Sequence, residues 1–431
     1  MKMSLISLVA CGLMFAATFA RGEENWPQFR GPTGQGIADA PNLPLNWSPD
    51  QNVRWKTPIH GKAWSSPVIW GNKIWLTSAT ADGKQLFVLC VDKQTGKILI
   101  DEKLFDVPTP QYCIPFNSYA SPTPVVEEGR VYVTFGSPGI ACLDSSNGKM
   151  LWQRRDFVCN HFRGAGASIL IWKNLLFLPF DGSDYQYVVA LDKRTGETVW
   201  RTDRSIDYKD IQPNGRPLGD GDMRKAFSTC RIADFGNGPI LLSEGSKCFY
   251  AYEPTTGKEI WRMENRKAHS GSITPLIGKD LIFYTTGHGS PPELWALKPG
   301  GHAVLTDSQV AWKAKRAVPT RSSPVLYDGL IYMVNDTGVV NCVDASNGQD
   351  VWHGRIDGTF SAAPIVAAGR VYFFSEDGPA TVLATGREFK VLATNHLDAG
   401  CMASPAVSGN ALFIRTKTSL YCIQSNVTAM R

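Results

Sequence analysis

One ten-residue phrase recurs along this chain and limits what the chain can fold into. "LDSSNGKMLW" ends at Trp152, "LDKRTGETVW" at Trp200, "YEPTTGKEIW" at Trp261 and "VDASNGQDVW" at Trp352. "VDKQTGKILI" ends at Ile100 and has Ile where the other copies have Trp. A repeat of this kind, with its copies spread along most of the chain, indicates a tandem array of supersecondary units.

The units that carry this phrase also begin alike. Each opens with an apolar run, a Gly-containing turn and a second apolar run, which is a hairpin pattern. Two further apolar runs follow, and no long segment has the period of a helix. Clear openings begin at Trp64, Ser121, Arg321, Ser361 and Met402, and weaker ones near Gly166, Phe227 and Ser272. The sequence therefore predicts an all-β, eight-bladed β-propeller with four-stranded antiparallel blades.

The repeated phrase can be explained by contacts that hold neighbouring blades together. Its Asp can accept hydrogen bonds from the turn, and Gly148 can adopt a positive φ there. Its Trp falls on the outermost strand, where the ring can be buried against the next blade and the indole N–H can reach a carbonyl. The position two residues before the Asp holds Cys or Ala, as a tight buried position requires. The predicted blade-docking residues are Trp55, Trp152, Trp200, Trp261, Trp312 and Trp352.

The two ends of the chain predict how the ring closes. The last unit reaches "SLYCIQSNV" and lacks an outer strand, while "NVRWKTP" (52–58) precedes the first unit. We expect Val53 to Lys56 to complete the last blade, since this would cover edges that an open ring exposes. Residues 52–425 would then form one propeller, preceded by an N-terminal extension over 21–51.

Residues 1–20 have the form of an export signal. Lys2 is followed by an apolar run to Ala20, and small residues precede the expected cleavage point. We expect a periplasmic or extracellular protein; "LVAC", which ends at Cys11, offers lipid anchoring as an alternative. No later stretch is apolar enough to span a membrane. The net charge of +5 without a Lys/Arg cluster argues against nucleic-acid binding, and we expect a monomer.

The repeated phrase also resembles that of a known family. The pattern A/C-x-D-x-x-T/N-G-x-x-x-W is similar to the tryptophan-docking motif of propellers with pyrroloquinoline-quinone (PQQ)-type repeats. That family includes quinoprotein alcohol dehydrogenases and the non-catalytic propeller of outer-membrane assembly lipoproteins. "WPQFRGPTGQGIA" (26–38) resembles the start of many exported bacterial PQQ-repeat propellers.

The resemblance predicts the fold, but it does not by itself assign an activity. The dehydrogenases have adjacent cysteines beside the cofactor and a calcium-binding Glu, Asn and Asp; this chain has no adjacent cysteines, and we match no such ligands. We therefore assign no catalytic residue, no metal and no cofactor, and expect a non-catalytic binding or scaffold protein of the bacterial envelope. The alternatives are a dehydrogenase that uses PQQ with calcium, and an outer-membrane assembly lipoprotein.

A candidate binding site follows from the predicted ring. Segments that lead into the inner strands should converge on the channel mouth, where a positive potential would be concentrated. Two long connectors, 101–118 and 201–224, should lie on the same face. The candidate ligand-binding residues are Lys62, Arg163, Arg224, Lys225, His269 and Arg321, and the nearest acids on such segments are Asp222, Asp357 and Asp398.

The expected ligand of this site is anionic. It would be a carboxylated or sulfated saccharide, a small acid or an acidic loop of a protein partner, since Arg163 and Arg321 could bind a carboxylate through two N–H groups. A solvated basic rim without a specific ligand is the alternative.

Overall fold

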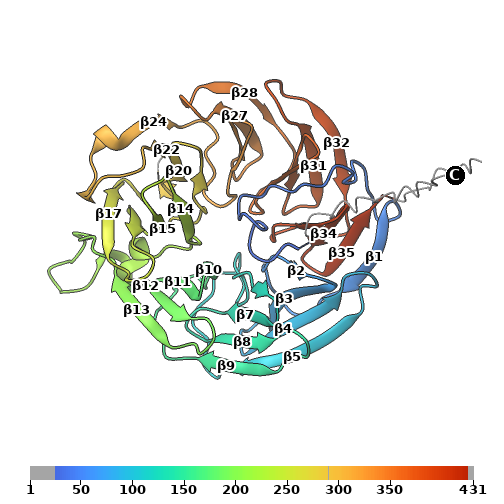
Figure 1. Cartoon of the computed structure of the whole chain (residues 1–431), viewed down its shortest axis with the longest axis horizontal. Helices are drawn as coiled ribbons and strands as arrows, with labels where there is room; N and C mark the ends of the chain where they lie inside the picture. The colour runs from blue at the N-terminus through green and yellow to red at the C-terminus, as the bar shows by residue number, and fades with distance from the viewer. Residues whose placement is uncertain (1–24, 290, 426–431) are drawn as a thin grey trace, which may run out of the picture.

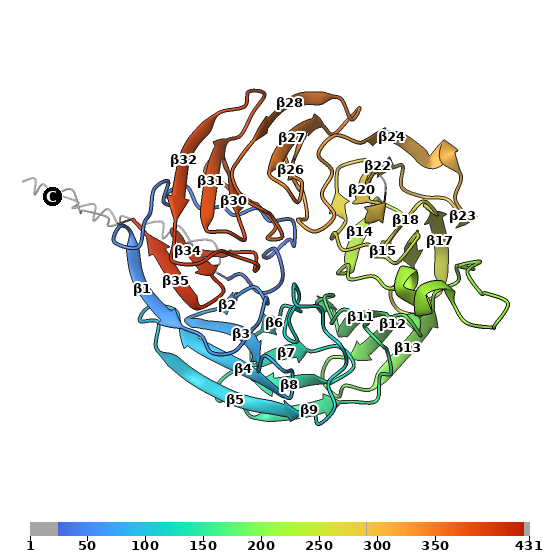
Figure 2. The same cartoon turned by 180° about the vertical axis from the view of Figure 1, so that it is seen from behind.

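Eight four-stranded antiparallel blades form a closed ring in the computed structural model, which describes residues 25–289 and 291–425 (Figures 1 and 2). The expected eight-bladed propeller is confirmed. Residues 1–24 lie outside the described part, so the predicted export signal and Cys11 are not addressed. No helix within the described residues is long and apolar enough to cross a membrane.

The strands follow the predicted hairpins closely. Blade 1 contains β2 (Val68–Trp70), β3 (Lys73–Ala79), β4 (Gln85–Asp92) and β5 (Ile98–Asp106). Blade 2 contains β6 (Val125–Glu127), β7 (Arg130–Thr134), β8 (Ile140–Asp144) and β9 (Met150–Arg154). Blade 3 contains β10 (Leu170–Trp172), β11 (Leu175–Asp181), β12 (Gln186–Asp192) and β13 (Thr198–Asp203). Blade 4 contains β14 (Arg231–Asp234), β15 (Pro239–Glu244), β16 (Cys248–Tyr252) and β17 (Glu259–Glu264).

The second half of the ring repeats this order. Blade 5 contains β19 (Leu276–Ile277), β20 (Ile282–Thr285), β22 (Leu294–Leu297) and β24 (Val310–Ala314). Blade 6 contains β25 (Val325–Tyr327), β26 (Leu330–Val334), β27 (Val339–Asp344) and β28 (Asp350–Arg355). Blade 7 contains β29 (Ile365–Ala367), β30 (Arg370–Phe374), β31 (Pro379–Ala384) and β32 (Val391–His396). Blade 8 contains β33 (Ala406–Ser408), β34 (Ala411–Arg415) and β35 (Ser419–Gln424), with β1 (Val53–Pro58) as its outer strand.

A few elements lie outside the regular pattern. β23 (Ala303–Val304) adds a short parallel strand to blade 4, and β18 (Ala268–His269) pairs with β21 (His288–Gly289) as a separate ribbon. The 3₁₀ segments are η1 (Leu218–Arg224) and η2 (Asp307–Gln309).

Ring closure is achieved by the strand that the sequence indicates. β1 pairs with β35 in antiparallel register, with Trp55 opposite Cys422. The last strand of the chain therefore lies between β34 and β1 rather than at a free edge. This pairing removes the exposed edge that would otherwise recruit another chain.

The blades adhere through buried tryptophans on the outer strands. Trp200 Nε1 donates to Pro254 O at 2.9 Å, and Trp352 Nε1 to Gly386 O at 2.9 Å, so each indole bonds to the next blade. Trp200 also lies over Gly257, where an added Cβ would come within 2.5 Å of the ring. Ile100 takes the same place over Gly148. The phrase thus supplies a large side chain on one blade and a glycine on the next.

The N-terminal extension crosses one end of the central channel. Residues 26–38, called the strap here, cross the ring and bond to inner strands on several sides. Trp26 pairs with Ile69 of blade 1, and Ala38 N donates to Val366 O of blade 7 at 2.9 Å. Gln35 Nε2 donates to Ile277 O of blade 5 at 2.9 Å. The strap therefore lies across one end of the central channel.

Candidate functional site: the central channel

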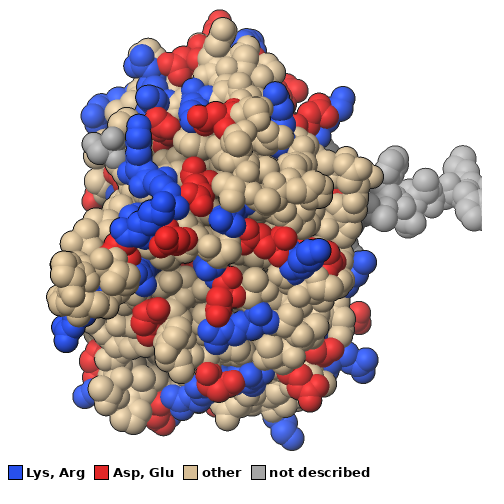
Figure 3. Space-filling model, turned by 90° about the vertical axis from the view of Figure 1, so that its left-hand side faces the viewer, with Lys and Arg blue, Asp and Glu red and all other residues tan. Residues whose placement is uncertain are grey.

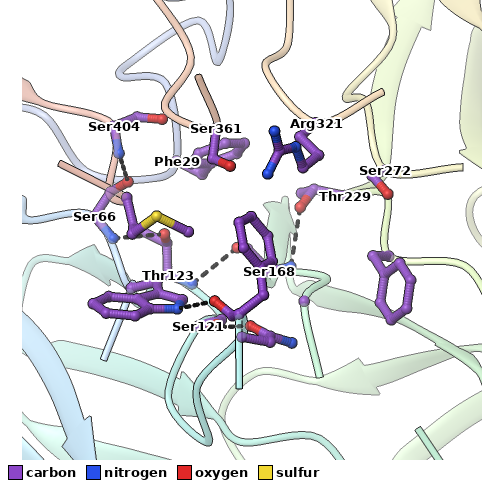
Figure 4. Close-up of a pocket in the computed structure, with 16 residues that line it drawn as sticks. Phe29, Ser66, Ser121, Thr123, Ser168, Thr229, Ser272, Arg321, Ser361 and Ser404 are labelled. Atoms are coloured by element: carbon purple, nitrogen blue, oxygen red, sulfur yellow. Dashed lines mark hydrogen bonds between the residues drawn. The ribbon is translucent and has the colours of Figure 1, made fainter. Parts of the chain in front are cut away.

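The central channel holds a cavity of about 180 Å³ that is open to solvent (Figure 4). Trp64, Phe116 and Phe227 line it together with Phe29 of the strap. Arg321 is the charged residue of the lining. The remaining side chains are mostly hydroxyls, so the cavity combines flat apolar faces with many hydrogen-bonding groups.

The hydroxyls form a belt that joins neighbouring blades. In each link, a backbone N–H at the start of an inner strand donates to the hydroxyl at the same place in the next blade, at 2.8 to 3.1 Å. The recurring Ser or Thr in the unit openings carries this signal, which the sequence interpretation did not use. The links are Ser66 to Thr123, Thr123 to Ser168, Ser168 to Thr229, Thr274 to Ser323, Ala363 to Ser404, and Ser404 to Ser66.

Arg321 joins the cavity to two carboxylates. Its Nε lies 3.2 Å from Asp336 Oδ2, and its Nη1 lies 3.2 Å from Glu376 Oε1. The guanidinium also stacks on Phe116, 4.6 Å from the ring centroid. Ser361, another lining residue, donates to Glu376 at 2.6 Å. Arg321 is therefore held firmly in place, and much of its charge is compensated.

The structure brings two other predicted cations together around one acid. Arg163 and Lys225 both form ion pairs with Asp222, and Arg163 Nη2 lies 3.1 Å from Asp222 Oδ2. Lys225 is 2% exposed, and burial lowers its pKa. Arg224 instead pairs with Asp210, at 3.0 Å from Nε.

The remaining two candidates make contacts of other kinds. Lys62 Nζ donates to Pro115 O at 2.5 Å and lies over the ring of Trp64. His269 stacks on His288 with ring centroids 6.1 Å apart. Burial, with His288 and Lys225 nearby, lowers the pKa of His269 to about 4, so the ring is neutral at neutral pH.

Neighbouring acids change the expected positive potential at the channel mouth. Asp222, which the sequence places near these cations, does meet them. Asp210 lies on the same connector as Arg224, Asp336 follows β26 and Glu376 follows β30; these acids were missed because the sequence analysis considered only segments that lead into inner strands. The outer surface shows the same balance, since basic and acidic side chains alternate over the side of blades 3 to 5 (Figure 3). Anion binding by the six candidate residues stays a prediction.

A family model described as "Outer membrane protein assembly factor BamB" matches residues 88–206 and 184–427. The chain belongs to this family of PQQ-repeat β-propellers.

Similar curated proteins are quinone-dependent enzymes. The dehydrogenase subunit of the alcohol dehydrogenase (quinone) of Acetobacter aceti is 26% identical over 333 residues, which are 72% of this chain and 37% of that protein. The quinoprotein ethanol dehydrogenase of Pseudomonas aeruginosa is 28% identical over 213 residues, 46% of this chain and 30% of that protein. This chain thus spans only about a third of the length of these relatives.

Solved structures agree on the fold. A europium-containing methanol dehydrogenase has a TM-score of 0.66 at 12% identity, covering 92% of this chain and 90% of that one. BamB from Moraxella catarrhalis has a TM-score of 0.57 at 11% identity, covering 86% of this chain and 99% of that one.

These relatives correct one expectation from the sequence. The assignment of no cofactor is contradicted, because the relatives that match are named quinone and quinoprotein dehydrogenases. The sequence analysis assigned no cofactor because the chain lacks adjacent cysteines and shows no metal ligands in a recognisable sequence motif. That reasoning was wrong. A cofactor held in a propeller channel is bound by side chains from separate blades, and such a set has no fixed spacing in the sequence.

Proposed function

We propose that the channel cavity holds a flat, anionic quinone cofactor of the PQQ kind and that the protein is an oxidoreductase for small alcohols. The observation that carries this proposal is the cavity itself, where aromatic faces and one guanidinium meet at the axis of the ring. The quinone dehydrogenases among the relatives support this assignment over the non-catalytic scaffold expected from the sequence.

The aromatic rings and the guanidinium that line the cavity suit such an organic cofactor. Trp64 and Phe116 offer ring faces for stacking, and Trp64 Nε1 is fixed by a 3.0 Å bond to Phe116 O. Arg321 has N–H groups beyond the two that face Asp336 and Glu376, and these can donate to a carboxylate or a quinone oxygen. The cavity is smaller than the roughly 300 Å³ at the lower end of small-molecule sites, so a fused ring system would project into the mouth.

No metal forms part of the proposal. Within the described ranges, no group of three or more His, Cys, Asp or Glu side chains is arranged to hold a metal ion.

The chain's own residues would position the cofactor and handle a proton. A bound quinone supplies the capacity to take two electrons from an alcohol. Arg321 would orient it. Glu376 accepts a hydrogen bond from Ser361 at 2.6 Å and pairs with Arg321, so it lies directly behind the cavity wall. It would accept the proton of a substrate hydroxyl by way of the Ser361 hydroxyl, which lines the cavity.

Titration with PQQ tests this assignment. We expect saturable, one-to-one quenching of tryptophan fluorescence, and Arg321→Met to weaken binding about tenfold because a charge-assisted bond is lost. Arg355→Met, at an exposed arginine on β28, is the matched control and should bind like the parent. Reduction of a dye by a primary alcohol should require added PQQ. Absence of binding, or binding without alcohol-dependent reduction, contradicts the proposal.

A second candidate is docking of a protein partner, which one observation favours. The long connectors and the loops beside them expose large apolar side chains, at 64% for Tyr112, 62% for Ile211 and 57% for Leu218. Exposed apolar residues that gather on one face often mark interaction surfaces. A pull-down from the native envelope with Tyr112→Ser and Ile211→Ser tests it; capture equal to that by the parent chain argues against this surface.

A further inference from the structure

Arg231 is a buried cation for which the described residues supply no carboxylate. It begins β14, the inner strand of blade 4, and is 7% exposed. Its Nε is buried without a hydrogen-bond acceptor. Arg163 and Arg321, the guanidiniums nearer the channel mouth, each pair with an acid instead.

A second guanidinium lies beside it. Arg30 of the strap is 2% exposed and donates to the carbonyls of Ser323, Pro324 and Gln35 at 2.6 to 2.9 Å, but its Nε also lacks an acceptor among the described residues. Burial and the positive charge of Arg231 lower the pKa of Arg30 to about 9, and burial lowers the pKa of Arg231 to about 10. Both groups therefore remain charged at neutral pH.

The two cations lie where the strap meets the channel. Thr229, two residues before Arg231, lines the cavity. Phe29, which precedes Arg30, lines the cavity from the strap. A Cβ on Gly34 would overlap Arg231 Nη1, so only glycine leaves room for this guanidinium.

Other buried arginines show how this fold ordinarily compensates such a charge. Arg204 is buried and binds Asp181 with two bonds, of 2.9 and 2.6 Å. Arg415 is buried and donates to three oxygens of Ser65 and Thr77 at 2.6 to 3.1 Å. Arg30 has carbonyl partners of the same kind, whereas the Arg231 guanidinium has no hydrogen-bond partner among the described residues. A buried cation without such partners is strongly unfavourable, and a bound anion removes the penalty.

We propose that Arg231 and Arg30 bind a small anion where the strap contacts blade 4 beside the channel, either a free inorganic anion or the carboxylate of a channel ligand. This site is independent of the proposed redox function, because it needs neither a quinone nor an alcohol. It also gives the "FRGPTGQG" segment (29–36) a role, since that segment supplies both Arg30 and the glycine beside Arg231.

Thermal unfolding in buffers of defined anion content tests the site. In a buffer whose only anion is bulky, Arg231→Met should melt higher than the parent chain, because a neutral side chain of similar length removes an uncompensated buried charge. Chloride, phosphate and acetate, added separately as sodium salts, should raise the melting temperature of the parent by about 2 °C or more with saturation. That saturable rise should be absent in Arg231→Met.

Arg415→Met is the matched control. It should melt lower than the parent at every anion concentration and keep the parent's anion response, because Arg415 already has oxygen partners. Calorimetry of the parent chain with phosphate and acetate gives a second measurement that needs no variant. A response to acetate alone assigns the site to a ligand carboxylate, and a response to chloride or phosphate assigns it to a free anion.

Two results overturn the proposal. One is a parent chain that shows no saturable response and no heat of binding with any of the three anions. The other is an Arg231→Met chain that responds to anions as the parent does, which leaves only non-specific salt effects.

Discussion

At the scale of single residues, the buried polar groups of this propeller differ in how well they are compensated. Asp181 and Arg204 compensate each other, whereas Glu244 is fully buried and neither of its oxygens has a hydrogen-bond partner among the described residues. Gly271 leaves the space that this side chain occupies, since a Cβ there would lie 2.5 Å from Oε1. Burial raises the pKa of Glu244 well above its ordinary value of 4.5, so the folded protein keeps this proton at pH values where a free glutamate has lost it.

We predict that Glu244→Gln changes how stability depends on pH. Above the ordinary pKa the unfolded chain ionises this residue while the folded chain keeps its proton, so the parent loses stability as pH rises until the folded pKa is reached. This loss is on the order of 1 kcal/mol for each pH unit. The Gln variant has no ionisable group at this position and lacks this loss. The unfolding free energy of Glu244→Gln relative to that of the parent should therefore increase from pH 5 to pH 8.

Urea titrations at both pH values measure this difference. The exposed Glu128→Gln is the control and should show little change with pH relative to the parent. A pH-independent difference between Glu244→Gln and the parent contradicts a neutral Glu244.

The docking tryptophans give a second prediction at this scale. Trp352 is 8% exposed and bonds to the next blade, so Trp352→Ala removes both buried area and a hydrogen bond. We expect a loss of about 3–5 kcal/mol in the free energy of unfolding, as for other large-to-small changes in a core. Denaturant titration measures this loss, and an unchanged midpoint would mean that the indole does not hold the two blades together.

At the scale of elements, each blade junction depends on the turn of one blade fitting the outer strand of its neighbour. Gly257 has φ +72° and lies under Trp200, while Gly129 has φ +77° with nothing within 4 Å of an added Cβ. The two positions share a backbone conformation and differ in what they touch.

Alanine substitution at these two glycines separates strain from docking. Gly129→Ala should cost about 1 kcal/mol through the left-handed backbone alone. Gly257→Ala should cost about 1–3 kcal/mol more, because its methyl group displaces the indole ring. Chemical denaturation of both variants gives the difference, and equal losses would show that the tryptophan contact contributes nothing.

At the scale of the whole molecule, closure joins the two ends of a long chain. β1 and β35 pair although seven complete blades separate them along the chain, and the strap crosses the ring before β1 begins. Both features come from the segment that precedes blade 1.

A chain that starts at Ile59 should therefore lose both the pairing of β1 with β35 and the strap. We expect a lower melting temperature and concentration-dependent association, because β35 then presents an open edge. Adding a peptide of sequence 51–60 should restore monomeric behaviour, as measured by light scattering. A truncated chain that remains monomeric and equally stable contradicts this view of closure.

The sequence alone determined the features that depend on local repetition. Blade number, the small buried position held by Cys90 or Ala190, and the strand from Val53 that closes the ring all follow from a pattern that each unit carries in itself. Tertiary structure alone decided the channel. The carboxylates that compensate Arg321, the strap that crosses one end of the channel, and the surroundings of Arg231 depend on contacts that form only in the folded chain, and the repeated spacing of the units does not encode them. The lining of a ring comes from all its blades at once, and it exists only after the ring has closed.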